Sequence, residues 1–311
     1  MKFSYGSQRK EYGKALVELG HKRQDIVVLD ADLSGSTQTA AFGKEFPERF
    51  FNCGIAEANM MGTAAGLAAG GKTAFASTFA IFATGRAWEQ VRQSIAYPEM
   101  DVKIAATHAG ITVGEDGASH QTLEDVALMR TIPHMRVVVP ADSLEARKAT
   151  FAVAEAKGPF YLRMGRVDCP IVTEADAPFQ IGKASLLREG ADLTIISMGV
   201  LAGPCLEAAE CLQDRGISAR VVNMSTIKPL DLEMLLRCAK ETGYIVTAEE
   251  HNILSGLGSA VATALAETRP TPMRMIGVRD QFGQSGGTNE LLERYGLTAA
   301  DIVKAAEAVR K

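Results

Sequence analysis

The hydrophobic positions of this chain form short continuous runs, separated by longer stretches in which apolar residues recur at helical spacing. Uninterrupted apolar runs are typical of strands buried on both faces of a parallel sheet. In the first half of the chain the runs predict strands at 25–30, 50–53, 73–77, 102–107, 135–139 and 160–163. The stretches around them predict helices at 8–19, 57–69, 82–96, 123–129 and 143–156.

The same alternation returns after an irregular segment that contains Pro170 and Pro178. It predicts strands at 193–197, 219–222, 244–247 and 273–278, and helices at 203–214, 232–242, 259–267 and 299–309. We therefore expect an α/β protein with two doubly wound domains, each a mostly parallel sheet flanked by helices. The predicted boundaries are 1–168 for the first domain, 169–188 for a linker and 189–311 for the second domain.

Composition narrows the class of protein further. The chain has 311 residues, a formal net charge of −4 and a pI near 5.8, so it offers no basic surface for nucleic acid. It has no apolar signal segment and no stretch long enough to span a membrane. The five cysteines form no CxxC pair and no metal-ligand spacing, so we expect reduced thiols, a cytoplasmic protein and no metal ligands.

Glu57 is a lone acid at the start of a predicted helix that carries no further charge before Lys72. The glycines and alanines between them would let another copy or another chain approach closely. A carboxyl buried in such a segment has to be hydrogen-bonded or held protonated. The alternative is an acid placed in the first turn to suit the helix dipole.

The segment 107–121 combines two histidines, two acids and several glycines directly after a predicted strand. In parallel sheets, ligands bind beyond the carboxyl ends of the strands. Histidine donates and accepts protons near neutral pH, so His108 and His120 suit proton transfer to hydroxyl and carbonyl groups. A solvated loop is the alternative, and metal binding by the two histidines is disfavoured because the spacing closes no ligand set.

Two further sets of residues follow or flank the predicted strands. Phe79 and Phe82 could stack on a heteroaromatic cofactor, although their spacing is also that of plain core residues. Arg9, Ser36 and Arg163 could together grip a phosphate, while each alone is typical of a surface or ion-pair residue.

Taken together, these motifs closely resemble those of transketolases. RFFNCGIAE (49–57), STF (77–79) and GEDGASHQ (114–121) occur in the order and spacing of the transketolase pyrimidine-binding domain. EEH (249–251), GLG (256–258) and FGQSG (282–286) are similar to the C-terminal domain of the same family. The resemblance covers essentially the whole chain.

The resemblance implies an enzyme that uses thiamine diphosphate. Glu57 would share a proton with the aminopyrimidine ring of the cofactor, and Glu57 and His120 would be the catalytic residues. The cofactor contacts besides Glu57 would be Ile55, Phe79 and Phe82. The sugar phosphate would be bound by Arg9, Ser36, His108, Asp116, His120 and Arg163. Animal members of the family tend to have Gln in place of His120.

Full-length transketolases also carry an N-terminal domain that holds Mg²⁺ and the diphosphate through a Gly-Asp-Gly motif and a downstream Asn. Because that domain has no counterpart here, the resemblance implies the C-terminal subunit of a split transketolase, which transfers a two-carbon ketol unit between sugar phosphates. An N-terminal partner subunit would share the thiamine diphosphate and hold the Mg²⁺, in a heterotetramer with two copies of each chain. The alternatives are the beta subunit of a 2-oxo acid dehydrogenase, 1-deoxyxylulose-5-phosphate synthase, and a non-catalytic scaffold subunit of a thiamine enzyme.

Overall fold

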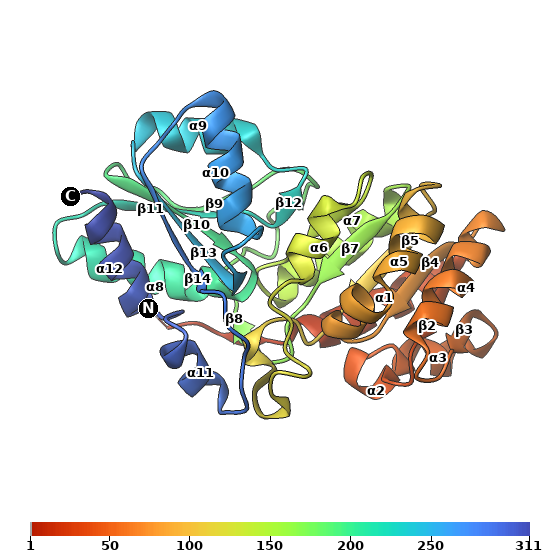
Figure 1. Cartoon of the computed structure of the whole chain (residues 1–311). Coiled ribbons are helices and arrows are strands. Elements are labelled where there is room, and N and C mark those ends of the chain that lie inside the picture. Colours follow the sequence, from red (N-terminus) through yellow and green to blue (C-terminus); the bar gives the residue numbers. More distant parts are fainter. Residues whose placement is uncertain (1) are drawn as a thin grey trace.

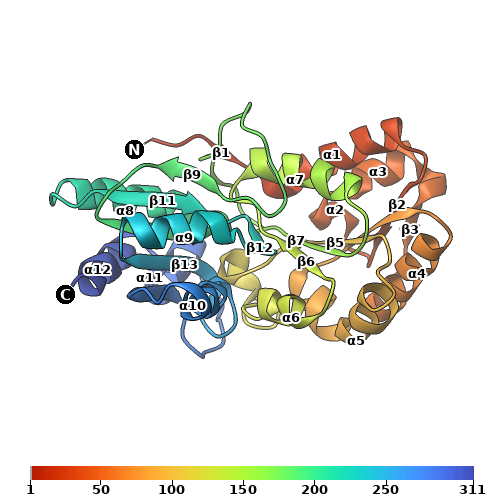
Figure 2. The ribbon, with the colours of Figure 1, turned by 90° about the horizontal axis from the view of Figure 1, so that it is seen from above.

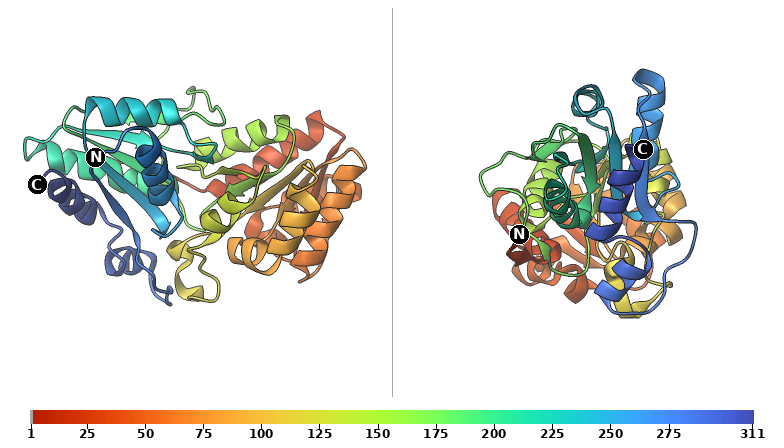
Figure 3. Two further views of the ribbon diagram at one scale, coloured as in Figure 1. Left: turned by 45° about the horizontal axis from the view of Figure 1, so that its top comes forward. Right: turned by 90° about the vertical axis from the view of Figure 1, so that its left-hand side faces the viewer.

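The computed structural model describes residues 2–311 and contains two α/β domains that lie side by side (Figure 1). The first domain holds a seven-stranded sheet and the second a five-stranded sheet. The two sheets lie in separate halves of an elongated molecule when it is seen from above (Figure 2) and in the tilted view at the left of Figure 3. The predicted fold class is thus confirmed. Among residues 2–311, no helix is long and apolar enough to cross a membrane.

The sheet of the first domain has the strand order β12-β6-β7-β5-β4-β2-β3, and only β12 runs antiparallel to its neighbour. Successive strand residues point to opposite faces, so Val28 joins one apolar cluster while Val27 and Leu29 join another. The strands are β2 (Ile26–Asp30), β3 (Phe50–Asn52), β4 (Thr73–Ser77), β5 (Val102–Ala106), β6 (Arg136–Val138), β7 (Phe160–Arg163) and β12 (Thr226–Lys228).

Helices cover both faces of this sheet. On the face that contains Val28, Phe75 and Phe160, the covering helices are α1 (Gln8–Lys22), α3 (Ala40–Glu45) and α7 (Ser143–Glu155). On the opposite face they are α4 (Glu57–Ala69), the π-helical segment η2 (Phe82–Arg86), α5 (Trp88–Gln90), a second π-helical segment η3 (Val91–Ala96) and α6 (Asp125–Thr131). The short connections are α2 (Ser34–Thr37), η1 (Pro47–Arg49) and η4 (Ile111–Asp116).

The sheet of the second domain has the order β14-β13-β10-β11-β9, and only β9 is antiparallel to its neighbour. Its strands are β9 (Ser185–Arg188), β10 (Leu193–Met198), β11 (Ala219–Asn223), β13 (Ile245–Asn252) and β14 (Met273–Val278). One face packs against α8 (Ala202–Gln213) and α12 (Ala299–Val309), and the other against α9 (Leu232–Glu241) and α10 (Leu257–Thr268). The remaining segments are η5 (Gly199–Leu201) and α11 (Thr288–Arg294), which contacts η4 of the first domain.

The segment 169–188, predicted to be a linker between the domains, contains regular strands. That segment contains β8 (Cys169–Pro170), which pairs with β1 (Tyr5–Gly6), and it also contains β9 of the second sheet. Further along, β12 leaves the second domain and pairs with β6. One apolar cluster therefore runs through both domains, with Met129 and Met135 from the first and Met224 and Ile227 from the second.

Two predicted helices differ clearly from those observed, while others are shifted by one or two residues at their ends. The helix predicted at 8–19 continues to Lys22, so Gly20 does not end it. Gly20 instead lets the Phe46 ring approach the helix, since a Cβ at this position would lie 2.3 Å from that ring. The helix predicted at 82–96 is divided into η2, α5 and η3, with Ala87 outside regular helical geometry at φ −106° and ψ 14°. Such wide turns inside helices often occur at functional sites.

Candidate active site

Three adjacent parallel strands, β2, β4 and β5, end at Asp30, Ser77 and Ala106 on the same edge of the first sheet. The loops that follow bring together most of the polar and aromatic residues singled out by the sequence. The loop after β2 is fixed by Asp30, whose carboxylate accepts hydrogen bonds from Leu33 N (2.6 Å), Thr37 Oγ1 (2.6 Å) and Thr39 Oγ1 (2.9 Å). Burial raises the pKa of Asp30 above its usual range. This side chain thereby positions the turn that carries Ser36.

Glu57 is the first residue of α4, and it is 1% exposed. Arg86 Nη1 donates to both of its carboxylate oxygens, at 3.0 Å to Oε1 and 2.9 Å to Oε2. A buried carboxylate requires such a partner, because an uncompensated charge is expensive away from water. Arg86, which the sequence analysis did not identify, ends η2, and about half of its side chain is exposed.

Four rings gather beside this ion pair. The rings of Phe79 and Phe82 are nearly parallel, with centroids 6.0 Å apart and an interplanar angle of 13°. Phe79 also stacks on His108 at 3.7 Å, and His120 meets Phe82 edge-on at 5.5 Å. The Arg86 guanidinium lies over the Phe82 ring at 4.7 Å, so the four rings and the Glu57 ion pair are in contact through Arg86 and Phe82.

His108 is a buried, neutral imidazole in a cationic environment. Its backbone adopts φ +57°, and its Nδ1 is 2.9 Å from Thr107 Oγ1. Burial, together with the positive charges of Arg9 and Arg166, lowers the pKa of His108 to about 3. At neutral pH this ring therefore has one donor and one acceptor nitrogen.

Two arginines, Arg9 and Arg166, stand next to each other in front of this histidine. Arg9 donates from Nε to the Arg166 carbonyl (3.0 Å) and from Nη1 to the Ser36 carbonyl (2.5 Å). Burial and the charge of Arg166 both lower the pKa of Arg9. Arg166 itself donates to Val113 O and to Glu115 Oε2. Two neighbouring guanidinium groups repel each other, and an anion bound between them would relieve that repulsion.

The structure places Arg163 away from this pair. Arg163 is 4% exposed, and its Nε lies 2.7 Å from Asp125 Oδ2 while its Nη2 donates to the Glu250 carbonyl at 3.0 Å. The Asp125 and Glu250 charges raise the pKa of Arg163, although burial opposes that change. Arg163, which was predicted to bind phosphate with Arg9 and Ser36, is instead buried between the domains, and Arg166 is the arginine that lies next to Arg9.

Two other predicted residues lie at the periphery. Asp116 is exposed at the end of η4, and it forms no hydrogen bond or ion pair with the other predicted site residues in the described part of the chain. Ile55 is 78% exposed on the loop before α4.

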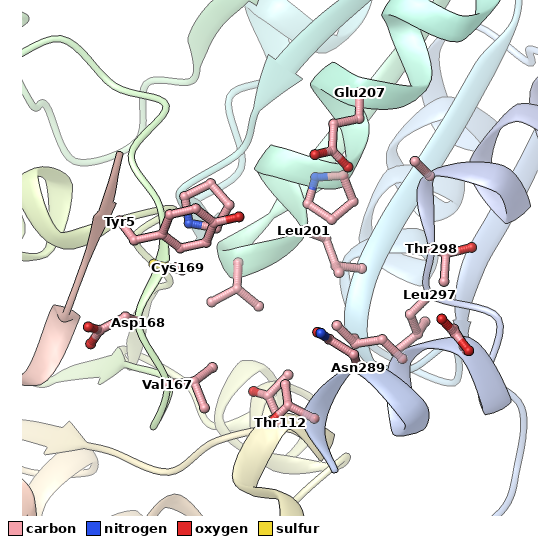
Figure 4. A pocket seen from close by; sticks show the side chains of 17 residues that line it. Tyr5, Thr112, Val167, Asp168, Cys169, Leu201, Glu207, Asn289, Leu297 and Thr298 are labelled. Atoms are coloured by element: carbon pink, nitrogen blue, oxygen red, sulfur yellow. The ribbon is translucent and has the colours of Figure 1, made fainter. Parts of the chain in front are cut away.

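A cavity of about 320 Å³ lies between the two domains, apart from these residues (Figure 4). Thr112 and Val167 of the first domain line it together with Leu201, Asn289 and Thr298 of the second (Figure 4). None of the predicted site residues lines this cavity. The candidate site is therefore identified by the residue types and contacts around Glu57 and His108, and not by this cavity. Among residues 2–311, no cluster of three or more His, Cys, Asp or Glu side chains is arranged to hold a metal ion.

Comparison with known proteins agrees with this architecture. The family "Transketolase, pyrimidine binding domain" matches residues 7–170, and "Transketolase, C-terminal domain" matches residues 182–302. A Methanocaldococcus jannaschii protein, provisionally named as a transketolase C-terminal section, is 53% identical and aligns over 96% of this chain and 95% of its own length. A 6-deoxy-6-sulfo-D-fructose transketolase subunit of a Clostridium species is 44% identical, with 97% and 94% covered.

Among solved structures, a split gene transketolase described as an inactive beta4 tetramer superposes with a TM-score of 0.92 at 54% identity. That match covers 97% of this chain and 98% of the other. The chain belongs to the transketolase family, a family of transferases whose domains imply dependence on thiamine diphosphate. Within the family it groups with the C-terminal subunits of split transketolases.

Proposed function

We propose that this chain, together with an N-terminal partner subunit, transfers a two-carbon ketol unit from a ketose phosphate to an aldose phosphate. The observation that carries the proposal is the buried carboxyl of Glu57 beside the stacked rings of Phe79 and Phe82. This combination suits an aminopyrimidine ring. The carboxyl would hydrogen-bond to a nitrogen at the edge of the ring, and an aromatic side chain would stack on its face. The residues present therefore fit the pyrimidine end of thiamine diphosphate.

Bound thiamine diphosphate would supply the nucleophilic carbon that attacks the sugar carbonyl. Glu57 would hold a proton at a ring nitrogen of the aminopyrimidine, because its burial keeps water from competing for that contact. Phe82 would stack on the ring, with Phe79 behind it, and Ile55 would cover the cofactor from its exposed loop. His120, whose ring meets Phe82 edge-on, would exchange a proton with a reacting hydroxyl.

Arg9 and Arg166 would bind the phosphate of the substrate, with His108 and the turn of Ser36 behind them. Guanidinium groups match phosphate oxygens in both charge and geometry. Because His108 is neutral, it would serve as a hydrogen-bond partner rather than as a charge. Asp116 and His120 would contact sugar hydroxyls.

A partner subunit would hold the diphosphate and Mg²⁺, and two copies of each chain would form a heterotetramer. Relatives described as subunits or C-terminal sections support this division of the enzyme. The exposed side of α4 supports close approach by another chain, since a Cβ at Gly62 or Gly66 would meet nothing within 4 Å. The five free thiols support a reducing compartment, the cytoplasm.

The test is turnover by the complex that co-purifies with this chain. Replacing Glu57→Ala removes the proton partner of the ring, so ketol transfer should fall by at least about 100-fold, the scale of a lost acid–base group. Glu267→Ala, an exposed substitution on α10, is the control and should leave turnover unchanged. Mass spectrometry of the co-purified chain should identify a partner that contains Gly-Asp-Gly followed by Asn. Turnover that survived loss of Glu57 would favour a scaffold subunit instead.

A further inference from the structure

Arg86 fills the place at which the proposed function requires a ligand. Its Nη1 satisfies both oxygens of Glu57, and its planar guanidinium lies over the Phe82 ring at 4.7 Å. A planar group with N–H donors, paired with Glu57 and lying over Phe82, resembles an aminopyrimidine in its donors and in its position over the ring. In this structure Arg86 therefore makes the contacts expected of the cofactor ring.

The two arrangements exclude each other. Arg86 Nη1 bridges the two oxygens of Glu57, where a ring nitrogen would have to bind, and one face of Phe82 cannot stack on two planar groups. A carboxylate bound to arginine is also a charge-assisted pair, which is about twice as strong as a neutral hydrogen bond. Cofactor binding thus has to displace Arg86.

The surroundings of Arg86 permit that displacement. About half of its side chain is already exposed, whereas Glu57 is 1% exposed, so the arginine can withdraw into water while the carboxyl stays in place. Arg86 ends the π-helical segment η2, and the following Ala87 is outside regular helical geometry. Wide π-helical turns of this kind often occur at functional sites.

We propose that Arg86 is a reversible block of the pyrimidine site: it pairs with Glu57 while the site holds no cofactor, and it leaves when the cofactor binds. This inference rests on the proposed function. Without the cofactor, the contact stabilises a buried carboxylate that would otherwise lack a partner. It also lowers the apparent affinity for the cofactor by the fraction of molecules in which the site is open.

The experiment measures the equilibrium Kd of thiamine diphosphate with Mg²⁺ for the complex of this chain with its co-purified partner. Trp88, the single tryptophan of the chain, lies two residues after Arg86 and reports the titration by fluorescence. Arg86→Met removes the guanidinium and keeps the stem over Phe82. Arg86→Gln keeps an uncharged NH2 donor near Glu57 and serves as the second variant if the methionine variant is unstable. Arg92→Met, an exposed arginine of η3 without an ion pair among the described residues, is the matched control.

Both Arg86 variants should bind about tenfold more tightly than the wild type if the site is closed in about nine molecules of ten, and Arg92→Met should not change the Kd. A purely structural role for Arg86 would not increase affinity. Unchanged or weaker binding by both Arg86 variants, with binding abolished by Glu57→Ala, overturns the block and leaves the proposed function intact. If no variant and no wild-type sample binds the cofactor, both proposals fail.

Discussion

Asp125 at the start of α6 and Arg163 at the end of β7 form a fully buried ion pair, with 2.7 Å between Oδ2 and Nε. Tyr161, two residues earlier on the same strand, donates to the same oxygen at 2.6 Å. Arg163 also donates to the Glu250 carbonyl of the second domain. The pair therefore lies at the junction of the two domains.

Arg163→Met should destabilise the chain by about 3–5 kcal/mol, because it leaves the Asp125 carboxylate buried without its cation. The measurement is urea denaturation of the full chain. In the assembled enzyme at low temperature, where the variant is still folded, the KM for sugar phosphate should stay close to that of the wild type. A large rise in KM without loss of stability would instead show that Arg163 binds the phosphate of the substrate.

Arg166→Met should raise the KM for a phosphorylated acceptor by about tenfold or more, the scale of one lost charge-assisted hydrogen bond. Arg9→Met should act in the same direction. Steady-state kinetics with a phosphorylated aldose and its unphosphorylated analogue check this, since only the phosphorylated substrate should lose affinity. Lys10→Met is the control, because Lys10 is an exposed cation on the same helix as Arg9.

Glu145 gives the free energy of unfolding a specific pH dependence. This buried residue of α7 accepts hydrogen bonds from Ala141 N (2.6 Å) and from Asn223 Nδ2 of the second domain (3.0 and 2.9 Å). Burial raises its pKa to about 7 in the folded chain, from 4.5 in the unfolded chain. The folded state thus binds the proton more tightly than the unfolded state. The contribution of Glu145 to the free energy of unfolding is therefore fully present below pH 4.5 and is lost as the pH rises to about 7.

Glu145→Gln removes this titration while keeping a polar side chain beside Asn223. Relative to the wild type, the variant should gain stability between pH 4.5 and pH 7, by at most about 3 kcal/mol. Urea denaturation at pH 4, 6 and 8 measures the difference. Glu267→Gln, an exposed substitution, should show no such pH-dependent gain. A difference that is constant across the three pH values would contradict the prediction.

The same substitution should have opposite effects at two helical glycines. Gly20→Ala should destabilise the chain by about 1–3 kcal/mol, because its Cβ would lie 2.3 Å from the Phe46 ring. Gly66→Ala should stabilise the isolated chain by up to about 1 kcal/mol, since a Cβ there meets nothing within 4 Å and alanine favours helix. Sedimentation of the Gly66 variant should show weaker assembly if α4 faces another chain. Equal destabilisation at both sites would contradict this difference.

Much of the fold follows from the sequence because the buried strands are continuous apolar runs. The helix at 57–69 and the strands at 73–77, 160–163 and 273–278 have the bounds that the sequence predicts. The strands that the sequence analysis missed, such as β8 and β12, are two and three residues long, and their partners lie far away in the chain. Local hydrophobic patterns carry no signal for such pairing.

The candidate site was predicted less completely, and Arg163 shows why. Sequence proximity to a strand end does not tell which face a side chain occupies: Phe160 and Leu162 pack with α1 and α7, whereas Tyr161 and Arg163 point to the face that contains Asp125. Arg166, three residues further on, lies beyond the strand end and turns toward Arg9. Arg86 was missed because its contact with Glu57 depends on the π-helical geometry of η2, which the 3.6-residue pattern does not reveal.

The pairing of β12 with β6 joins the two halves of the protein through main-chain hydrogen bonds. A hinge motion that opened the domains would have to break a sheet, so the halves should move as one body while substrates enter and leave. A chain shortened before Thr226 would expose the backbone of β6 as a free edge, and free edges recruit other strands. The pyrimidine-binding half should therefore not be stable in solution by itself. Without β12, which belongs to the C-terminal half of the chain, it would be prone to aggregate.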